Sequence, residues 1–504
     1  MSARSCPSTT QRSGSPTATH GCATPTPPPP SGPSAPPTSG RGAGSPARPA
    51  RASRRWPGCC TTRTGPRYQQ PVRKLVEGRV VPLPVVVVGA GLAGLACARR
   101  LRDHALDVVV LEAGDSPGGR VRSDRVDGFV VDRGFQVLNT AYPALRSVDL
   151  DRLDLRALPR GVRLRRGGRL ADLLHPLDSA GAVLRTAPSR AATTREKLAL
   201  ARYGAGVVLG PVGPVKGRPD IDSRSAWAQR LPQGAIDGAL QPFMAGVVLE
   251  REVTTSRVFT DLMIRMFARG LSTVPAAGMQ ALPELLASGL PPDTVRYGAK
   301  VVQVLPDAVR LADGRVVEAR AVVVATDPWT AHVLVPELGS PPAARGVTTY
   351  YFAADPWRRQ SGLLTADADG SGVLNSVILT ASVPEYSADG RSLIATSVLR
   401  DDAGPDLTVD AARDVAAELH RAPSGDWELV ATRDLPQALP AMPAPHQFRR
   451  PVHLVRTGVW VAGDHRDTSS IQGALVSGRR AATSVRRTLA TGGTHTAHDD
   501  RKAS

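Results

Sequence analysis

Three glycines and one acidic residue carry the clearest chemical signal in this sequence of 504 residues. The run Gly89-Ala90-Gly91-Leu92-Ala93-Gly94 has G-x-G-x-x-G spacing, and Glu112 follows Gly91 by 21 residues. In such a run the first glycine permits a sharp turn, the second leaves backbone open to a pyrophosphate, and the third lets a helix pack closely. A carboxylate about 20 residues later accepts hydrogen bonds from ribose hydroxyls and repels a 2′-phosphate. The pattern predicts a dinucleotide site with an unphosphorylated ribose; a glycine turn without a ligand is the alternative.

The flanking residues supply the elements that must position these groups. Apolar runs at 85–88 and 108–111 predict two strands, and the stretch from the glycines to about Arg102 predicts a helix between them. The amino end of that helix would offer free N–H groups and a positive dipole end to phosphates. The predicted strand, helix and second strand and the acid all stand where a dinucleotide-binding unit requires them, so the signal is more specific than glycine spacing alone.

The next residues distinguish between dinucleotides. Gly118-Gly119-Arg120 follows Glu112 within eight positions. This extension resembles the glutathione-reductase-type FAD fold, specifically the flavin amine oxidase and phytoene desaturase superfamily. The resemblance implies that Arg120 reaches the FAD pyrophosphate and that the backbone of Val301 contacts the adenine. A solvated surface arginine is the alternative for Arg120.

A second motif lies near the carboxyl end of the chain. The apolar strand 458–462 leads into Gly463-Asp464, and the segment 470–482 has the pattern of a helix. The resemblance implies that Asp464 holds the ribityl or pyrophosphate part of FAD and that the helix start lies beside the isoalloxazine. A helix amino end stabilises the negative charge that a reduced flavin gains. The resemblance covers roughly residues 83–487.

The resemblance implies FAD as the cofactor, and we expect it to be noncovalent because no cysteine follows Cys97. No metal site is predicted. His465 is the candidate acid or base, with a loop histidine bonded to backbone as the alternative. The predicted cofactor-binding residues are Gly89, Gly91, Leu92, Ala93, Gly94, Glu112, Ala113, Gly118, Gly119, Arg120, Val301, Gly463, Asp464, Gln472, Gly473 and Ala474.

The expected fold class is α/β, with a glutathione-reductase-type FAD-binding Rossmann domain and an interleaved α+β substrate domain. The predicted FAD-binding pieces are 83–140, 261–335 and 451–487. The predicted substrate-domain pieces are 141–260 and 336–450, with tails at 1–80 and 488–504. The ligand site should lie between the two domains.

Patterns within these pieces predict their elements. Residues 141–260 are mostly helical in pattern, and the apolar face of 241–249 is expected either to line a pocket or to pack in the core. Asp313-Gly314 predicts a hairpin between strands 300–311 and 316–325. Further strands are predicted at 347–353, 373–382 and 392–398, and adjacent Asp132 and Arg133 suggest an ordinary ion pair.

The net charge of +18 is concentrated at one end of the chain. Residues 1–80 hold 12 Lys and Arg and one acid, or +11, which leaves +7 for the rest. Fifteen of the 45 prolines also lie there, so we expect a disordered segment. A spacer or a start codon called too far upstream is favoured over two functional alternatives. The prolines oppose the amphipathic helix of a transit peptide, and an RNA-binding tail would need interleaved aromatics, which are lacking. No nucleic-acid partner is expected, and the cytoplasm is the expected compartment, with peripheral membrane contact if the substrate is a polyene.

Departures from the superfamily narrow the chemistry. The lysine that amine oxidases carry after the strand matching 322–325 is absent. The resemblance also implies two aromatic rings as an amine cage, one of them near the carboxyl-terminal motif. The last tyrosine is Tyr386, and of the later Trp427 and Trp460 the second belongs to the strand, so amine oxidation is disfavoured. The sequence therefore favours an FAD-dependent oxidoreductase that takes hydride from a large apolar or conjugated molecule, as phytoene desaturases and protoporphyrinogen oxidases do. A flavin amine oxidase is one alternative. A binding protein like the Rab escort and dissociation-inhibitor proteins is another, although those are expected to lose flavin contacts. The substrate, electron acceptor and oligomeric state are not determined by the sequence.

Overall fold

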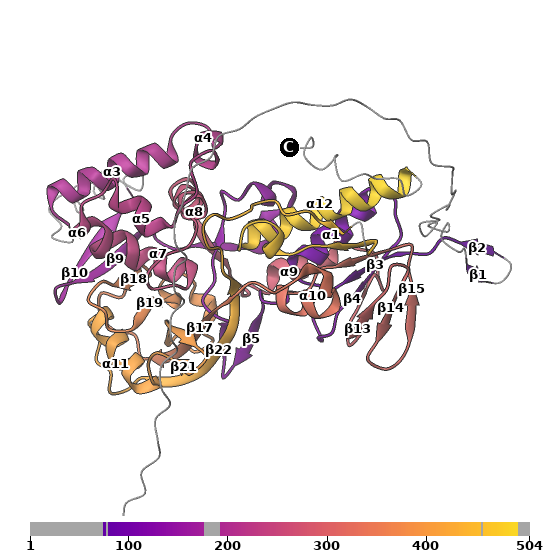
Figure 1. The fold of residues 1–504 in the computed structure, drawn as a ribbon. Helices are drawn as coiled ribbons and strands as arrows, with labels where there is room; N and C mark the ends of the chain where they lie inside the picture. Colours follow the sequence, from indigo (N-terminus) through magenta and orange to yellow (C-terminus); the bar gives the residue numbers. More distant parts are fainter. Residues whose placement is uncertain (1–73, 77–78, 176–191, 455–456, 492–504) are drawn as a thin grey trace, which may run out of the picture. The chain divides into compact units, whose positions relative to one another are not determined.

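The computed structural model describes residues 74–76, 79–175, 192–454 and 457–491 (Figure 1). They all belong to the compact unit Tyr68–Ser504; the other unit, Met1–Arg67, lies outside the described residues, as does most of the predicted tail 1–80. Within that tail the structure places one antiparallel hairpin, β1 (Lys74–Val76) with β2 (Arg79–Val81).

A six-stranded sheet carries the two motifs. Its strands, in order across the sheet, are β12 (Val295–Arg296), β4 (Val108–Leu111), β3 (Val85–Val88), β16 (Ala321–Val324), β24 (Val459–Val461) and β23 (His453–Leu454). All neighbours are parallel except β23 and β24. The predicted strand–helix–strand unit is confirmed by β3, α1 (Leu92–Asp103) and β4. The continuous valine runs are explained by burial on both faces, which is typical of parallel sheets.

Different elements cover the two faces of this sheet. On one face α1 and α12 (Ile471–Ala490) lie side by side, although they come from opposite ends of the described chain (Figure 1). A Cβ on Gly478 would lie 2.1 Å from the carbonyl oxygen of Ala93, so this close approach requires glycine. The other face packs against β13 (Val301–Val304), β14 (Ala308–Leu311) and β15 (Val316–Glu318). Because α12 runs to Ala490, the predicted tail beginning at 488 starts too early.

The predicted hairpin is confirmed only in part. Gly314 has φ +87° and β14 pairs antiparallel with β15, as Asp313-Gly314 predicts. The predicted strand 300–311 is instead divided into β13 and β14, with Pro306 between them, which has no N–H for a continuous ladder. The predicted strand 316–325 is also divided, because β16 joins the parallel sheet.

A second sheet has eight strands. Its order is β10 (Arg169–Leu174), β9 (Gly161–Arg166), β18 (Leu364–Asp367), β19 (Val373–Ile378), β20 (Ser392–Asp401), β17 (Ala344–Ala354) and β22 (Glu428–Pro440), with β21 (Gly404–Pro405) on β20. The strands predicted at 347–353 and 392–398 are confirmed, whereas β19 ends at Ile378 rather than at 382. One face packs on α11 (Val409–His420), a helix that the sequence analysis did not identify, and β22 was missed as well.

The prediction that 141–260 is mostly helical is wrong for its first third. Residues 155–157 form β8 (Leu155–Ala157), which pairs with β11 (Ser272–Pro275). Residues 161–174 form the hairpin of β9 and β10, because Gly167 and Gly168 both adopt the positive φ that a two-residue hairpin turn needs. The later residues are helical, as α3 (Thr194–Val208), α4 (Gly213–Lys216), α5 (Ser223–Ala228), α6 (Gln233–Ala235), η3 (Ile236–Leu240), α7 (Gln241–Val248) and α8 (Arg257–Arg269).

Short elements complete the described chain. The remaining strands are β5 (Ser123–Val126), β6 (Phe129–Asp132), β7 (Leu138–Asn139) and β11 (Ser272–Pro275). The remaining helices are η1 (Pro143–Ser147), η2 (Leu150–Leu153), α9 (Ala281–Ser288), α10 (Pro328–Leu334), η4 (Pro336–Leu338), η5 (Leu379–Ala381), η6 (Pro384–Tyr386) and η7 (Asp464–Arg466). None of the helices in the described ranges combines the length and the apolar character that a membrane crossing requires.

Asp132 connects several of these elements, and its predicted ion pair with Arg133 is wrong. Its carboxylate accepts hydrogen bonds from Ser123 Oγ at 2.5 Å, the Met279 amide at 2.9 Å and the Tyr386 hydroxyl at 3.0 Å. Arg133 instead pairs with Asp124. β6 ends at Asp132, and Arg133 lies in the bend that follows, so the two neighbouring charges do not share the strand. Burial raises the pKa of Asp132 to about 6, although the three hydrogen bonds lower it.

This carboxyl predicts a specific pH dependence of stability. Because the pKa of Asp132 is higher in the folded than in the unfolded chain, protonation stabilises the fold at pH values below the ordinary aspartate pKa. This stabilisation is lost as pH rises through about 6. The substitution Asp132→Asn would keep an acceptor for Ser123 and Met279 and would donate to Tyr386, without a charge. We expect the unfolding free energy of wild type to fall relative to this variant by about 2 to 3 kcal/mol between pH 4 and 7. Urea unfolding of both proteins across this pH range measures the difference. Parallel pH profiles for wild type and Asp132→Asn would contradict the prediction.

Candidate functional site

One cavity of about 1130 Å³ extends from the glycine turn after β3 to the inner face of the eight-stranded sheet. Ligand pockets for single drug-sized molecules usually have volumes of about 300 to 1,000 Å³. The cavity is therefore larger than the usual pocket for one drug-sized molecule.

The three glycines of the turn differ in their surroundings. Gly89 has φ +99°, and a Cβ there would lie 3.1 Å from the Ala325 oxygen, so both the turn and the contact with β16 favour glycine. A Cβ on Gly91 would meet no atom within 4 Å, and Gly91 lines the cavity. A Cβ on Gly94 would lie 1.9 Å from the Gly89 oxygen, which forces glycine at the start of α1. Bare backbone at Gly91 thus faces open space, as a pyrophosphate requires.

Glu112 lies at the end of β4 and also lines the cavity. Its Oε2 accepts a hydrogen bond from the Ala90 amide at 2.6 Å, and its Oε1 accepts one from the Gly114 amide at 2.8 Å. A carboxylate has about four lone-pair positions, so both oxygens can still accept from ligand hydroxyls. Glu112 therefore shapes the glycine turn and remains a suitable ribose acceptor.

The two motifs meet in an ion pair. Arg120 Nη2 donates to Asp464 Oδ1 at 2.7 Å, and Arg120 Nη1 donates to the Ala438 carbonyl at 2.9 Å. Asp464 is buried, whereas the Arg120 side chain is 34% exposed and lines the cavity. Burial lowers the pKa of Arg120, but the Asp464 carboxylate outweighs it and raises the pKa overall. Residues 344 positions apart are thus held together at the end of the cavity that the glycine turn and Glu112 line, which we call the nucleotide end.

Most of the predicted cofactor-binding residues line this cavity. They are Gly89, Gly91, Leu92, Ala93, Glu112, Ala113, Gly118, Gly119, Arg120, Val301, Gly463, Asp464 and Ala474. Gly94, Gln472 and Gly473 do not line it. Gln472 Oε1 accepts from the Ala144 amide at 2.8 Å, and a Cβ on Gly473 would lie 1.9 Å from the Thr468 oxygen, so both residues have packing roles beside the cavity.

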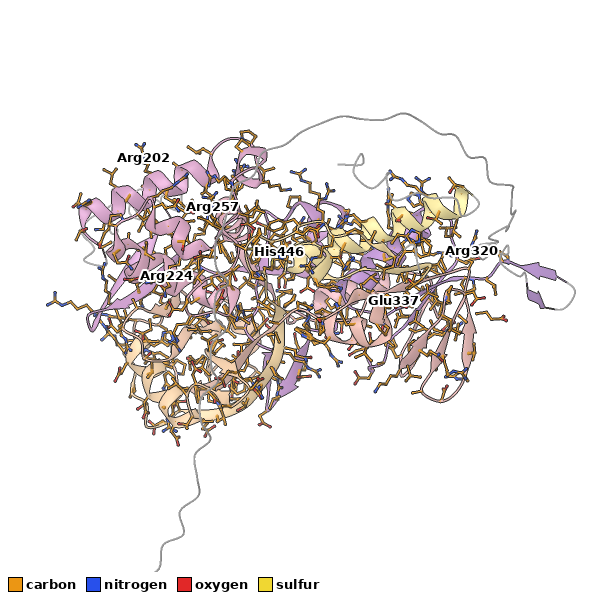
Figure 2. All side chains as sticks on the ribbon, in the orientation of Figure 1. Arg202, Arg224, Arg257, Arg320, Glu337 and His446 are labelled. Atoms are coloured by element: carbon orange, nitrogen blue, oxygen red, sulfur yellow. The ribbon has the colours of Figure 1, made fainter. Side chains whose placement is uncertain are left out.

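His465 is not placed for the proposed acid–base role. Its side chain is 1% exposed and does not line the large cavity; neither ring nitrogen has a hydrogen-bond partner among the described residues. Burial, followed by Arg466, holds the pKa of His465 well below its usual range. The ring instead borders a cavity of about 10 Å³ with His446, which is labelled in Figure 2. His465 is therefore a buried neutral residue behind Asp464.

The structure adds nucleotide-end residues that the sequence analysis missed. Thr326 and Asp327 follow β16 and line the cavity, and Asp327 caps α10 by accepting from the Thr330 amide at 2.9 Å. Asp327 also contributes to the raised pKa of Arg120, after the effects of burial and Asp464. The signal was present as an Asp-Pro pair directly after a buried strand, which is typical of a helix start.

The other end of the cavity is mostly apolar, although Arg160 and His175 also line the cavity. On helix α7, Phe243, Gly246 and Val247 line the cavity, whereas Met244 and Val248 are buried in the core. The segment 241–249 therefore both lines a pocket and packs in the core, the two alternatives that its sequence left open. Helix α8 contributes Phe259, Met263, Ile264 and Phe267. The acids among the described lining residues are Glu112, Asp327 and Asp464, all at the nucleotide end.

Curated relatives match short stretches of the chain. It is 41% identical over 92 residues to lysine-specific histone demethylase 1B of Mus musculus, 43% over 72 residues to protoporphyrinogen oxidase 2 of Arabidopsis thaliana, and 52% over 50 residues to the zeta-carotene-forming phytoene desaturase of Myxococcus xanthus. These matches cover 18%, 14% and 10% of this chain and only 11%, 14% and 10% of the relatives.

Solved structures match over most of their length. An oxidoreductase from Methanosarcina mazei has a TM-score of 0.61 at 16% identity, covering 80% of this chain and 100% of that one. Putrescine oxidase bound to putrescine has a TM-score of 0.59 at 19% identity, covering 81% and 99%. These likenesses establish the predicted α/β fold class.

The sequence profile described as flavin containing amine oxidoreductase matches residues 92–486, which include most of the cavity lining. With the glycine turn, Glu112 and the Arg120–Asp464 pair gathered at one end of the cavity, the chain belongs to the flavin containing amine oxidoreductase family.

Proposed function

We propose that this chain is an FAD-dependent oxidoreductase that removes hydride from a largely apolar or conjugated small molecule. The observation that carries the proposal is the continuity of the cavity: a nucleotide end lined by glycines and charged groups opens directly into an apolar end. The partial relatives named protoporphyrinogen oxidase and phytoene desaturase support the same substrate class.

The residues at the nucleotide end fit noncovalent FAD. Backbone at Gly91 leaves room for the pyrophosphate, Glu112 offers ribose acceptors, and Arg120 is a cation held at the cavity surface by Asp464. When bound, FAD supplies the hydride acceptor.

The protein's own task is then to orient the substrate and exclude water. Phe243 and Val247 from α7 and Phe267 from α8 present apolar surface to the substrate end. Such a wall orients an apolar molecule through its shape and excludes solvent from the reacting C–H bond. The proposal therefore requires no acid or base, which agrees with the position of His465.

The charges around the cavity argue against an amine. Its acids are at the nucleotide end and engaged by protein groups, while Arg133 and Arg160 also line the cavity. A substrate ammonium would lose its hydration without a free carboxylate to replace it. Amine oxidation therefore remains the less favoured alternative.

An absorption spectrum followed by anaerobic titration tests the proposal. We expect flavin bands in the purified protein, which bleach on addition of a polyene or a porphyrinogen and stay unchanged with putrescine or cyclohexylamine. Bleaching by the amines alone would overturn the substrate class. Protein that stays colourless after incubation with FAD would overturn the flavin site.

The flavin is expected to be released by acid. Cys97 is the one cysteine among the described residues; it is buried in α1, does not line the cavity, and burial raises the pKa of its thiol to about 12. Because the thiolate is the nucleophile, Cys97 is inert at neutral pH. Trichloroacetic acid precipitation should leave all flavin absorbance in the supernatant; yellow colour in the washed pellet would contradict noncovalent binding.

A further inference from the structure

Three polar side chains form a row on the sheet face of the otherwise apolar end. Thr349 of β17 lies opposite Ser397 of β20, and Ser397 lies opposite Asn375 of β19. All three line the cavity, and they are 0%, 3% and 5% exposed. Phe243 and Val247 of α7, which contacts β19 (Figure 1), line the same cavity.

An irregularity in β19 directs Asn375 to this face. The register shifts between Val373 and Asn375, so that Leu374 is an extra residue relative to β20. Leu374 packs in the main core on the cavity side, and Asn375 also lines the cavity, so two consecutive residues share a face. Bulges of this kind re-aim side chains and are frequent beside active sites.

The row has hydrogen-bonding capacity that the described protein does not use. Asn375 Oδ1 is buried and accepts no hydrogen bond from the described residues. Thr349 Oγ1 and Ser397 Oγ are 3.1 Å apart, so one hydroxyl donates to the other and a second hydroxyl proton remains. A buried amide oxygen without a partner costs about 1 to 3 kcal/mol. Because Oδ1 has almost no accessible surface, a ligand group recovers this cost once the Asn375 side chain turns its oxygen towards the cavity.

The position of Asn375 also depends on a glycine in the facing helix. A Cβ on Gly246 would lie 2.5 Å from Asn375 Nδ2, so a larger residue in α7 would displace the amide. The bulge and the glycine act together: one aims the amide and the other leaves space for it.

We propose that Asn375, with Ser397 and Thr349, determines specificity by binding a hydroxyl or N–H group on an otherwise apolar substrate. This rests on the proposed function and narrows it, because a pure hydrocarbon polyene would leave the row unsatisfied. A ligand O–H matches the row in both senses, since it can donate to an amide or hydroxyl oxygen and accept from the remaining proton.

Calorimetric titration of the flavin-loaded full chain tests this without relying on turnover. The probes are 4-butylphenol and butylbenzene, which differ by one hydroxyl. We expect Asn375→Leu, which is similar in size but apolar, to shift the ratio of the two dissociation constants about tenfold towards butylbenzene. Ser397→Ala, which adds no volume, should shift the ratio in the same direction and serves if Asn375→Leu does not fold.

Thr348→Val is the matched control. Thr348 lies next to Thr349 on β17, but its hydroxyl donates to Asp434 and it does not line the cavity. The ratio of the two dissociation constants for Thr348→Val should equal the wild-type ratio. An unchanged ratio in both Asn375→Leu and Ser397→Ala would overturn the inference while flavin bands and substrate bleaching persist. Loss of those signals in wild type would instead overturn the proposed function.

Discussion

Glu112→Arg is expected to reduce the flavin content of the purified protein to less than about one tenth of the wild-type value. The amides of buried Ala90 and half-buried Gly114 would lose the acceptors that now lie 2.6 and 2.8 Å away. This costs about 1 to 3 kcal/mol for Ala90, and less for Gly114. The substitution also places a cation and hydrogen-bond donors where ribose hydroxyls need an acceptor. Flavin absorbance relative to protein absorbance measures the effect.

The control for Glu112→Arg is the same charge reversal three residues later. The Asp115 side chain is 86% exposed, pairs with Arg122 at 2.8 Å and does not line the cavity. Asp115→Arg should therefore retain flavin. Glu112→Gln should give an intermediate content, because its amide keeps one acceptor oxygen and turns a donor towards the other backbone N–H. Wild-type flavin content in Glu112→Arg would remove Glu112 from the site.

Asp464→Ala is expected to lower the free energy of unfolding by about 3 kcal/mol and to weaken flavin retention. The substitution removes the partner of a partly buried guanidinium at 2.7 Å and also the acceptor of the His465 amide at 3.0 Å. Removing one member of a buried ion pair typically costs about 3 to 5 kcal/mol. Because the Arg120 side chain is partly exposed to the cavity, we expect a cost near the smaller of these values. Urea unfolding of flavin-loaded and flavin-stripped protein separates the two consequences.

A double-mutant cycle with Arg120→Ala isolates the pair itself. We expect a coupling energy of about 1 to 3 kcal/mol between positions 120 and 464. The same cycle on Arg100 and Asp103, whose side chains are 45% and 62% exposed, should give less than about 1 kcal/mol. Equal coupling in the two cycles would mean that the pair joining the motifs is no stronger than a surface contact.

Local chemistry explains which elements could be predicted. The strands at 85–88 and 108–111 and the helix after Gly91 were predictable because every local signal agreed: buried valines, glycines and an acid at the right distance. The strands at 155–174 were missed because their alternation is weak, although Gly167-Gly168 marked the turn. The strand 300–311 was predicted as one because its apolar residues continue past Pro306.

Contacts between distant segments could not be predicted in this way. Adjacent charges at Asp132 and Arg133 suggested an ion pair, but Arg133 lies in the bend after β6 and pairs with Asp124. Tyr386, 254 residues away, donates to the aspartate instead. His465 looked catalytic from its place beside Asp464, yet the turn at Gly463 places its ring behind the cavity. Sequence spacing gives no information on which side of a loop a side chain will lie.

The sequence by itself determined the nucleotide-binding turn, its acid and the family resemblance, because backbone conformation and hydrogen-bonding capacity at these positions depend on residue type over a few neighbours. The tertiary structure alone decided that Arg120 meets Asp464, that His465 is buried, and that Thr349, Ser397 and Asn375 share one cavity wall. Those arrangements depend on strand register and on packing between segments hundreds of residues apart, which no local pattern records.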